Sequence, residues 1–311
     1  MVLEMSYSKS SKQKGSAKAI PHSGESKLTN GFGQVAPGLY VVSTPIGNMR
    51  DITLRAIDTL NAVDEVLAED TRTARKLFNA HSISTTLTSY HDHNGAIRRP
   101  EIIERLQDGA NFALISDAGT PLVSDPGWKL VHEAAIAGID IIPIPGASAM
   151  LAGLITSALP SDKFMFCGFL PPKSGGRKKV LETLQTVPGT LIFYESGPRL
   201  IDCLADMRDI LGDNRPAAVA RELTKLFEET RRGNLAELFA HYEEVGRPKG
   251  EIVVLVGPPL REEAPDEAVL KALLAEALKT QSTKSAANEL SDRFNLPKRD
   301  VYQLALTLKD D

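Results

Sequence analysis

Short apolar runs alternate with amphipathic stretches over the first half of the chain. Each run has the length and apolar character of a buried strand, and each amphipathic stretch repeats its apolar residues at helical spacing. The predicted strands are residues 39–42, 63–68, 112–116 and 139–144. The first predicted helix starts at Asp51 as its N-cap, with Leu54, Ile57 and Leu60 on one apolar face, and another covers residues 128–137. Strands that alternate with helices favour an α/β lobe with a largely parallel sheet.

The same pattern starts again after Pro160. The strands predicted there are residues 164–169, 190–194, 217–220 and 251–256, and a helix is predicted over residues 199–211. Beyond Pro259 only helical patterns follow, broken at residues 282–283 and at Pro297. We therefore expect two α/β lobes and a small C-terminal unit of three helices, at residues 37–159, 160–259 and 265–311.

Residues 1–36 are rich in Ser, Lys and Gly and carry almost no periodic apolar residues. Such a segment buries too little apolar surface to offset the entropy lost on ordering, which predicts a disordered, solvated tail. Contact between its lysines and phosphate groups is the alternative interpretation.

Composition narrows the possible classes of protein. The 311 residues are 42% hydrophobic and 24% charged, which is ordinary for a globular protein. The net charge of −4 means that a nucleic acid would have to bind a local basic surface. The two cysteines, Cys167 and Cys203, form no disulfide framework. The longest apolar run, residues 147–159, is too short to span a bilayer, so we expect a soluble, cytoplasmic protein.

Several familiar catalytic motifs are absent from the sequence. It contains neither a GxxxxGK[ST] phosphate loop nor a GxGxxG turn after a strand, which disfavours nucleotide hydrolysis and dinucleotide redox chemistry. His91 and His93 have the spacing found in some metal hydrolases, but the remaining histidines form no recognisable ligand pattern. We therefore predict no metal site.

Loops of small residues follow three predicted strands of the first lobe, at residues 44–48, 116–121 and 145–149. Each loop taken alone is compatible with an ordinary tight turn. In open α/β sheets, however, ligands bind beyond the carboxyl ends of the strands, and Gly and Ala let a ligand approach the backbone closely. Together the loops predict a cleft lined by backbone groups, suited to an uncharged or zwitterionic ligand rather than to a triphosphate.

Short motifs occur in a specific order along the chain, at residues 40–48 (YVVSTPIGN), 69–72 (EDTR), 91–94 (HDHN), 116–121 (SDAGTP), 193–196 (FYES), 220–225 (ARELTK) and 249–251 (KGE). Their order and spacing resemble the tetrapyrrole methylase superfamily and, within it, the ribosomal RNA small subunit methyltransferase I family. The resemblance extends from about residue 38 to residue 308. It implies two α/β lobes that hold S-adenosylmethionine in the cleft between them, and a homodimer.

The resemblance also implies which residues contact the methyl donor. These lie in the loops of small residues and in the second lobe, at Pro45, Ile46, Ala118, Gly119, Thr120, Val123, Ser148, Ala149, Glu195, Leu223 and Val254. The branch of the superfamily that methylates tetrapyrroles usually has GxGPG in the first loop and an aspartate at the position of Thr120. These departures favour RNA over a porphyrinoid as the substrate.

A ribose hydroxyl is a weak nucleophile, so an enzyme that methylates it must align the oxygen with the methyl group. A nearby base that removes the hydroxyl proton adds further rate. The candidates in this sequence are Asp70, His91, His93, Glu195 and Glu222. The sequence does not choose among them, and water is a further alternative.

The positions of basic residues in the sequence predict where RNA phosphates would bind. A predicted flexible loop holds four positive charges, at Lys173, Arg177, Lys178 and Lys179. Three more follow strand ends predicted to face the cleft, at Arg72, Arg221 and Lys225. The alternatives are a solvated loop in the first case and structural ion pairs with Glu69, Asp70 or Glu222 in the second. The C-terminal helices also carry basic residues and are predicted either to dock RNA or to act as a stabilising cap.

The favoured interpretation is an S-adenosylmethionine-dependent methyltransferase that acts on the ribose 2′-hydroxyl of a cytidine in the decoding region of bacterial 16S rRNA. Its expected partner is 16S rRNA or the small ribosomal subunit. The first alternative is a tetrapyrrole C-methyltransferase. The second is a ribosome assembly factor that keeps the fold without turnover.

Overall fold

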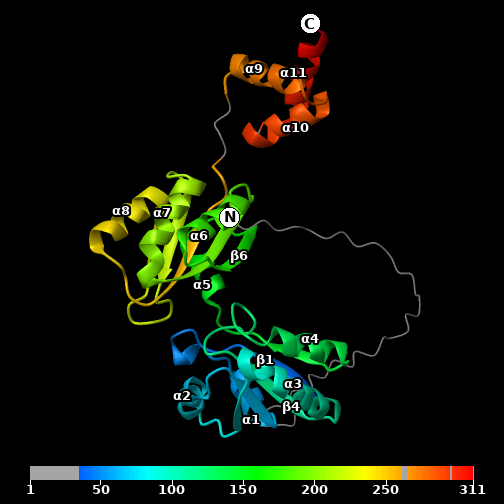
Figure 1. Cartoon of the computed structure of the whole chain (residues 1–311), viewed down its shortest axis with the longest axis vertical. Helices are drawn as coiled ribbons and strands as arrows, with labels where there is room; N and C mark the ends of the chain where they lie inside the picture. Colours follow the sequence, from blue (N-terminus) through cyan, green and yellow to red (C-terminus); the bar gives the residue numbers. More distant parts are fainter. Residues whose placement is uncertain (1–34, 261–264, 295, 311) are drawn as a thin grey trace, which may run out of the picture.

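The structure is a computed structural model that describes residues 35–260, 265–294 and 296–310 (Figure 1). The side chains of residues 92, 93, 309 and 310 lie outside this description. Most of the predicted disordered tail, residues 1–36, also lies outside the described residues. The end of that segment is ordered, because Val35 is buried in the core of the first lobe.

The first lobe is built on a five-stranded sheet in the order β3-β2-β4-β1-β5. All of its strand pairs are parallel, as the alternation of strands and helices predicted. The strands are β1 (Gly38–Val42), β2 (Glu65–Ala68), β3 (Thr86–Ser89), β4 (Asn111–Ile115) and β5 (Ile141–Ile144). The carboxyl ends of β4, β1 and β5 therefore lie side by side at one edge of the sheet.

Helices cover both faces of this sheet (Figure 1). One face packs against α1 (Leu54–Ala62) and α2 (Thr71–His81), and the other against α3 (Asp92–Gln107) and α4 (Trp128–Ile136). Neighbouring strand residues divide between the two cores: Leu39 packs with α3 and α4, whereas Tyr40 packs with α1 and α2. Burial on both faces explains why these strands appear in the sequence as continuous apolar runs.

The start of the first helix differs from the prediction. Asp51 lies in a short 3-10 turn, η1 (Met49–Asp51), and Thr53 caps α1 by accepting a hydrogen bond from the Ala56 N–H at 3.1 Å. The buried face of α1 also differs from the expected one: Ala56, Thr59 and Leu60 are buried, whereas Leu54 is 81% exposed.

The second lobe has a mixed sheet in the order β6-β7-β10-β8-β9. Only the pair β6 and β7 is parallel. The strands are β6 (Phe164–Phe169), β7 (Thr190–Ser196), β8 (Pro216–Arg221), β9 (Glu229–Asn234) and β10 (Glu251–Val256). One face is covered by α6 (Ser174–Leu184), α7 (Leu200–Leu211), which follows the turn η2 (Gly197–Arg199), and α8 (Leu235–Val245).

The opposite face of the second sheet packs against α5 (Ala149–Ser157). This helix precedes the predicted border between the lobes at residue 159, yet it contacts β7, β8, β9 and β10. Gly153 allows the close approach, because a Cβ atom there would lie 3.0 Å from Cγ1 of Val253. By its packing, α5 belongs to the second sheet.

Residues 173–179 do not form the predicted flexible loop. Lys173 is the N-cap of α6, and the rest of the segment forms the first turns of that helix. Ser174 anchors the start of α6 through a hydrogen bond from its hydroxyl to Asp206 Oδ1 at 2.9 Å. The basic cluster is therefore held on a helix that packs against α7.

The C-terminal unit consists of the three predicted helices: α9 (Glu267–Leu278), α10 (Thr283–Phe294) and α11 (Lys298–Asp310). They pack around their own apolar core, which includes Leu274, Leu290 and Val301. Across the described residues, no helix combines the length and the apolar character that a membrane crossing requires.

The docking of α5 gives a stability prediction with a matched control. We expect Gly153→Ala to lower the melting temperature by about 2–4 °C, because opening the contact with Val253 costs about 2 kcal/mol and the helix preference of alanine returns only about half of it. Gly175→Ala in α6 meets no atom within 4 Å and should raise the melting temperature, because alanine favours the helix. Calorimetry of both variants checks this, and a rise for both would show that α5 is not closely docked.

Candidate functional site

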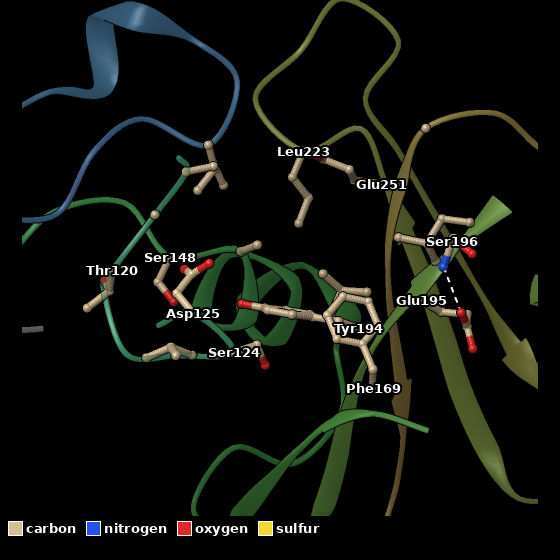
Figure 2. A pocket seen from close by; sticks show the side chains of 18 residues that line it. Thr120, Ser124, Asp125, Ser148, Phe169, Tyr194, Glu195, Ser196, Leu223 and Glu251 are labelled. Atoms are coloured by element: carbon tan, nitrogen blue, oxygen red, sulfur yellow. Dashed lines mark hydrogen bonds between the residues drawn. The ribbon is translucent and has the colours of Figure 1, made fainter. Parts of the chain in front are cut away.

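A cavity of about 330 Å³ lies where the strand-end loops of the first lobe meet the second sheet (Figure 2). The first lobe supplies residues from the three loops that the sequence singled out, together with Ser124 and Asp125. The second lobe supplies residues from β6, β7 and β10 and from the loop after β8, including Phe169, Tyr194 and Leu223. The volume falls within the range of sites that hold small organic ligands.

Hydrogen bonds from main-chain and side-chain groups tie the three loops to one another. Thr44 and Gly119 exchange two of them, at 2.8 and 3.1 Å, which joins the first loop to the second as a short antiparallel bridge. The Thr120 hydroxyl lies 3.0 Å from the Ser43 hydroxyl and donates to the Ala147 carbonyl at 3.2 Å. The three loops therefore form one connected cavity wall.

The second loop has an unusual backbone. Gly119 has a φ of 81°, and Leu122 and Ser124 adopt φ values of 74° and 64°, a region that non-glycine residues rarely occupy. Such conformations persist where the surrounding structure holds them, and they are frequent at binding sites. They turn the chain so that Ser124 and Asp125 come to line the cavity.

Aromatic side chains close the cavity on the side of the second lobe. Phe166 and Phe169 contact the Tyr194 ring edge to face, with centroids 4.8 and 5.7 Å away. The Tyr194 hydroxyl accepts a hydrogen bond from the Met150 N–H at 3.2 Å, which connects β7 to the start of α5. Burial raises the pKa of Tyr194. This wall offers an apolar, aromatic surface to a ligand.

The two lobes also touch beside the cavity. The Asn48 N–H donates to the Thr224 hydroxyl at 3.0 Å, and a Cβ atom on Gly47 would lie 2.5 Å from the Lys225 side chain. The Lys225 ammonium binds Glu222 and Glu251 at 2.8 Å each. The first loop thus packs directly on the loop that carries Leu223.

Comparison with known proteins identifies the family. Residues 38–238 match Tetrapyrrole (Corrin/Porphyrin) Methylases, and residues 263–309 match the RsmI C-terminal HTH domain. Ribosomal RNA small subunit methyltransferase I of Mesorhizobium japonicum is 50% identical over 88% of this chain and 93% of its own length. The protein of that name from Escherichia coli O157:H7 is 43% identical over 86% of this chain and 94% of its own.

The chain belongs to the ribosomal RNA small subunit methyltransferase I family. Solved structures agree on the fold at much lower identity. A diphthine synthase superposes with a TM-score of 0.56 at 15% identity, covering 71% of this chain and 89% of that one. A cobalt precorrin-4 methyltransferase superposes with a TM-score of 0.53 at 16% identity, covering 70% and 94%.

Enzymes of this family use S-adenosylmethionine as the methyl donor. When bound, this molecule supplies a methyl group on a positively charged sulfonium. The cavity suits such a ligand, because the described residues that line it include the carboxylate of Asp125 but no Lys, Arg or His. The small-residue loops bring backbone groups close enough to bind its polar parts.

Nine of the residues expected to contact the donor line the cavity: Ile46, Ala118, Gly119, Thr120, Val123, Ser148, Ala149, Glu195 and Leu223. Pro45 and Val254 do not. The side chain of Val254 is fully buried in the core beneath α6, α7 and α8. Its neighbour Val253 faces the cavity in its place, because successive residues of a strand point to opposite faces.

Side chains also alternate along β7, and this turns the Glu195 carboxylate away from the cavity, where it cannot act as the base. The backbone of Glu195 borders the cavity, but its side chain faces the α7 side, where Oε1 lies 3.1 Å from Arg199 Nε and 2.8 Å from the Ser196 N–H. Figure 2 shows the carboxylate turned away from Tyr194 and the cavity. This buried group ties the end of β7 to the turn that follows it.

The carboxylates of Asp70 and Glu222 accept hydrogen bonds from backbone N–H groups. Asp70 caps α2, and its carboxylate binds Arg72 at 2.7 Å; hydrogen bonds from Arg72 lower the pKa of Asp70 to about 2. Glu222 accepts from Lys225 and from the Glu251 N–H at 3.0 Å, and the hydrogen bond from Lys225 lowers its pKa. Neither carboxylate lines the cavity, and a low pKa makes each a weak proton acceptor.

The two histidines lie at the start of α3. His91 is its N-cap and forms a capping box with Asn94, and it does not line the cavity. The side chain of His93 lies outside the described part of the structure, so its predicted role stays a prediction. Within the described residues, no cluster of three or more His, Cys, Asp or Glu side chains is arranged to hold a metal ion.

The basic candidates divide into buried, paired and exposed groups. Arg177 is buried, with Nε 2.6 Å from Asp206 and a further hydrogen bond to the Asp202 carbonyl, so we withdraw it as a phosphate contact. Lys178 pairs with Asp209 at 2.6 Å, and Arg221 with Glu229 at 3.2 Å. Lys173 and Lys179 are exposed, and the side chain of Arg72 is 89% exposed.

Sequence analysis missed Asp125. It lines the cavity, and burial together with the charges of Glu69 and Asp117 raises its pKa to about 6. Nothing in the local sequence distinguishes it from Asp117 in the same loop. The position of the loop after a strand was the one signal in the sequence that pointed to a ligand site. The positive φ values that orient the residues of the loop are not visible in the sequence.

We expect Gly119→Ala to weaken S-adenosylmethionine binding at least tenfold. A Cβ atom there would lie 3.2 Å from Ile46 Cγ2 and would project between two donor-binding loops. Gly138→Ala is the matched control, because Gly138 also has a positive φ, of 74°, but meets no atom within 4 Å. Both variants should lose about 1 kcal/mol of stability from backbone strain. Calorimetry that finds equal donor affinity for the two variants would place the donor elsewhere.

Proposed function

We propose that this chain transfers the methyl group of S-adenosylmethionine to the 2′-hydroxyl of a cytidine in the decoding region of bacterial 16S rRNA. The observation that carries the proposal is the cavity, whose small-residue loops and Asp125 carboxylate suit a cationic methyl donor. The names of the relatives support ribosomal RNA of the small subunit as the substrate.

A tetrapyrrole substrate has less support. Thr120 takes the position at which that branch of the superfamily usually has an aspartate, and its hydroxyl is occupied by Ser43 and the Ala147 carbonyl. The C-terminal helices also favour RNA. The described residues of α10 and α11 expose Lys284, Arg293, Lys298 and Arg299, a set of cations suited to phosphate groups.

The residues of this chain would act mainly by alignment. The three hydrogen-bonded loops and the aromatic surface around Tyr194 would hold the donor in one position. A donor held in this way presents its methyl group to the incoming hydroxyl in one direction. Exposed cations, among them Arg72, Lys173 and Lys179, would hold the RNA backbone without reading its sequence. We also propose a cytoplasmic homodimer, as the resemblance to the superfamily implies.

The activity is tested with methyl-labelled donor. We expect label to enter small ribosomal subunits from a strain that lacks the modification, and to map to a single cytidine ribose. A 2′-deoxy substitution at that nucleotide should abolish transfer, because the accepting oxygen is gone. Label in a porphyrinogen but not in the subunit would favour the tetrapyrrole alternative, and subunit binding without any transfer would favour the assembly factor.

The exposed lysines of α6 give a second prediction. Replacing Lys173 and Lys179 with alanine should weaken subunit binding and flatten its dependence on salt, by close to one unit of slope for each lost phosphate contact. Donor affinity should stay the same. The control is Arg98→Ala with Lys129→Ala, which removes the same charge from the exposed surface of α3 and α4. Equal slopes for the two double variants would show that α6 does not contact RNA.

A further inference from the structure

Asp125 has a position that no other carboxylate of the site shares. It follows the strained turn at Leu122 and Ser124 and lines the cavity formed by the donor-binding loops. Figure 2 shows it on the same side of the cavity as Thr120 and Ser148, with Tyr194 across the open space. Its carboxylate therefore faces the space in which a donor and a nucleophile would meet.

The other acidic residues that border the cavity are already engaged. The Glu195 carboxylate faces the α7 side of the sheet, beside Arg199. The Glu251 carboxylate binds Lys225 at 2.8 Å, and its side chain is 77% exposed. No ion pair with a Lys or Arg is found for Asp125 within the described residues. Asp125 therefore lines the cavity and has no cation beside it, among the described residues, that would neutralise its charge.

The surroundings of Asp125 favour its protonated form more than water does. Burial is the largest cause of the raised pKa, followed by the charges of Glu69 and Asp117, and a hydrogen bond from Ser116 offsets them only partly. Tyr194 faces Asp125 from the second lobe, and the charge of Asp125 contributes to the raised pKa of that phenol. A proton acceptor works best when its pKa lies near the working pH, a condition that Asp125 meets and Asp70 does not.

We propose that Asp125 is the catalytic residue that accepts the proton of the attacking ribose hydroxyl. The inference rests on the proposed function. The bond between the ribose oxygen and the methyl carbon forms as the bond between sulfur and that carbon breaks, and the sulfonium becomes a neutral thioether. The hydroxyl proton passes to the Asp125 carboxylate and from there to solvent.

The raised pKa determines the direction of the pH dependence. In the protein without donor, Asp125 is protonated below about pH 6 and cannot accept a proton, so kcat/KM should rise through this range and level off above it. Binding of a cation near Asp125 favours the ionised carboxylate. Donor binding near pH 6 should therefore release protons, by thermodynamic linkage.

The first experiment replaces Asp125 with asparagine, which keeps the shape and removes the proton acceptor. We expect kcat on small subunits to fall by about 10²–10⁴, with loss of the rise in kcat/KM near pH 6. Donor affinity should fall by a smaller factor, of about ten or less, because the asparagine also lacks the charge that favours a cationic donor. Calorimetry in buffers of different ionisation enthalpy should detect proton release on donor binding by the wild-type protein and none by Asp125→Asn.

The second experiment uses Asp117→Asn, which leaves Asp125 in place. Asp117 does not line the cavity, and an asparagine oxygen can still accept the hydrogen bond that the Asp70 N–H donates at 3.1 Å. Loss of its charge should lower the pKa of Asp125. We expect the rise in kcat/KM to move to lower pH, while its plateau value stays the same.

Distinct results separate the two proposals. Wild-type turnover and pH dependence in Asp125→Asn, or an unmoved profile in Asp117→Asn, would overturn the role of Asp125. The Asp117→Asn profile decides the question if Asp125→Asn does not fold. A wild-type protein that binds the donor, releases protons on binding and methylates no subunit would instead contradict the proposed function.

Discussion

The hydrogen-bonded pair formed by Thr44 and Gly119 is the constraint on which the rest of the site depends. It joins loops from two neighbouring strands, and the contact between Thr120 and Ala147 adds the loop of a third. Parallel strands deliver these loops to one edge of the sheet, but only the cross-links fix their relative positions. Helix α5 begins at the end of the third loop and packs on the second sheet. The linked loops therefore bring both lobes to the same cavity.

Several charged residues that the sequence offered for catalysis or RNA binding instead hold the backbone or the helices in place. Asp70 caps a helix, Glu222 holds the strand end at Glu251, and Arg177 anchors α6 to α7. In each case an ion pair or a main-chain donor satisfies the group, which stabilises its charged form. Groups used in this way are poor proton acceptors. A carboxylate with no cation beside it, such as Asp125, retains the affinity for a proton that a base requires.

Burial on both faces of a sheet is what made much of the fold predictable. The runs at β1, β4 and β10 are continuous, apolar and largely buried, and their predicted bounds agree with the structure to within a residue. The sequence analysis missed β3 and β9, which lie at the edges of the two sheets and carry mainly polar residues. An edge strand needs no continuous apolar run, and charged side chains there prevent pairing with other chains. Helix α6 was missed for a related reason, because its first turns contain glycines and lysines.

The residues proposed to bind the donor were predictable to the extent that they lie in strand-end loops. The proposed base was not, because the orientation of its side chain depends on the backbone. Whether Val253 or Val254 faces the cavity follows from strand alternation, but only after the register of β10 is known. Asp125 depends on more than register. Positive φ values at Leu122 and Ser124 turn the chain between Asp117 and Asp125, so of these two aspartates Asp117 is exposed and Asp125 lines the cavity. The position of each residue in the structure, rather than its type, separates Asp117, which accepts a backbone hydrogen bond, from Asp125, the proposed catalytic residue.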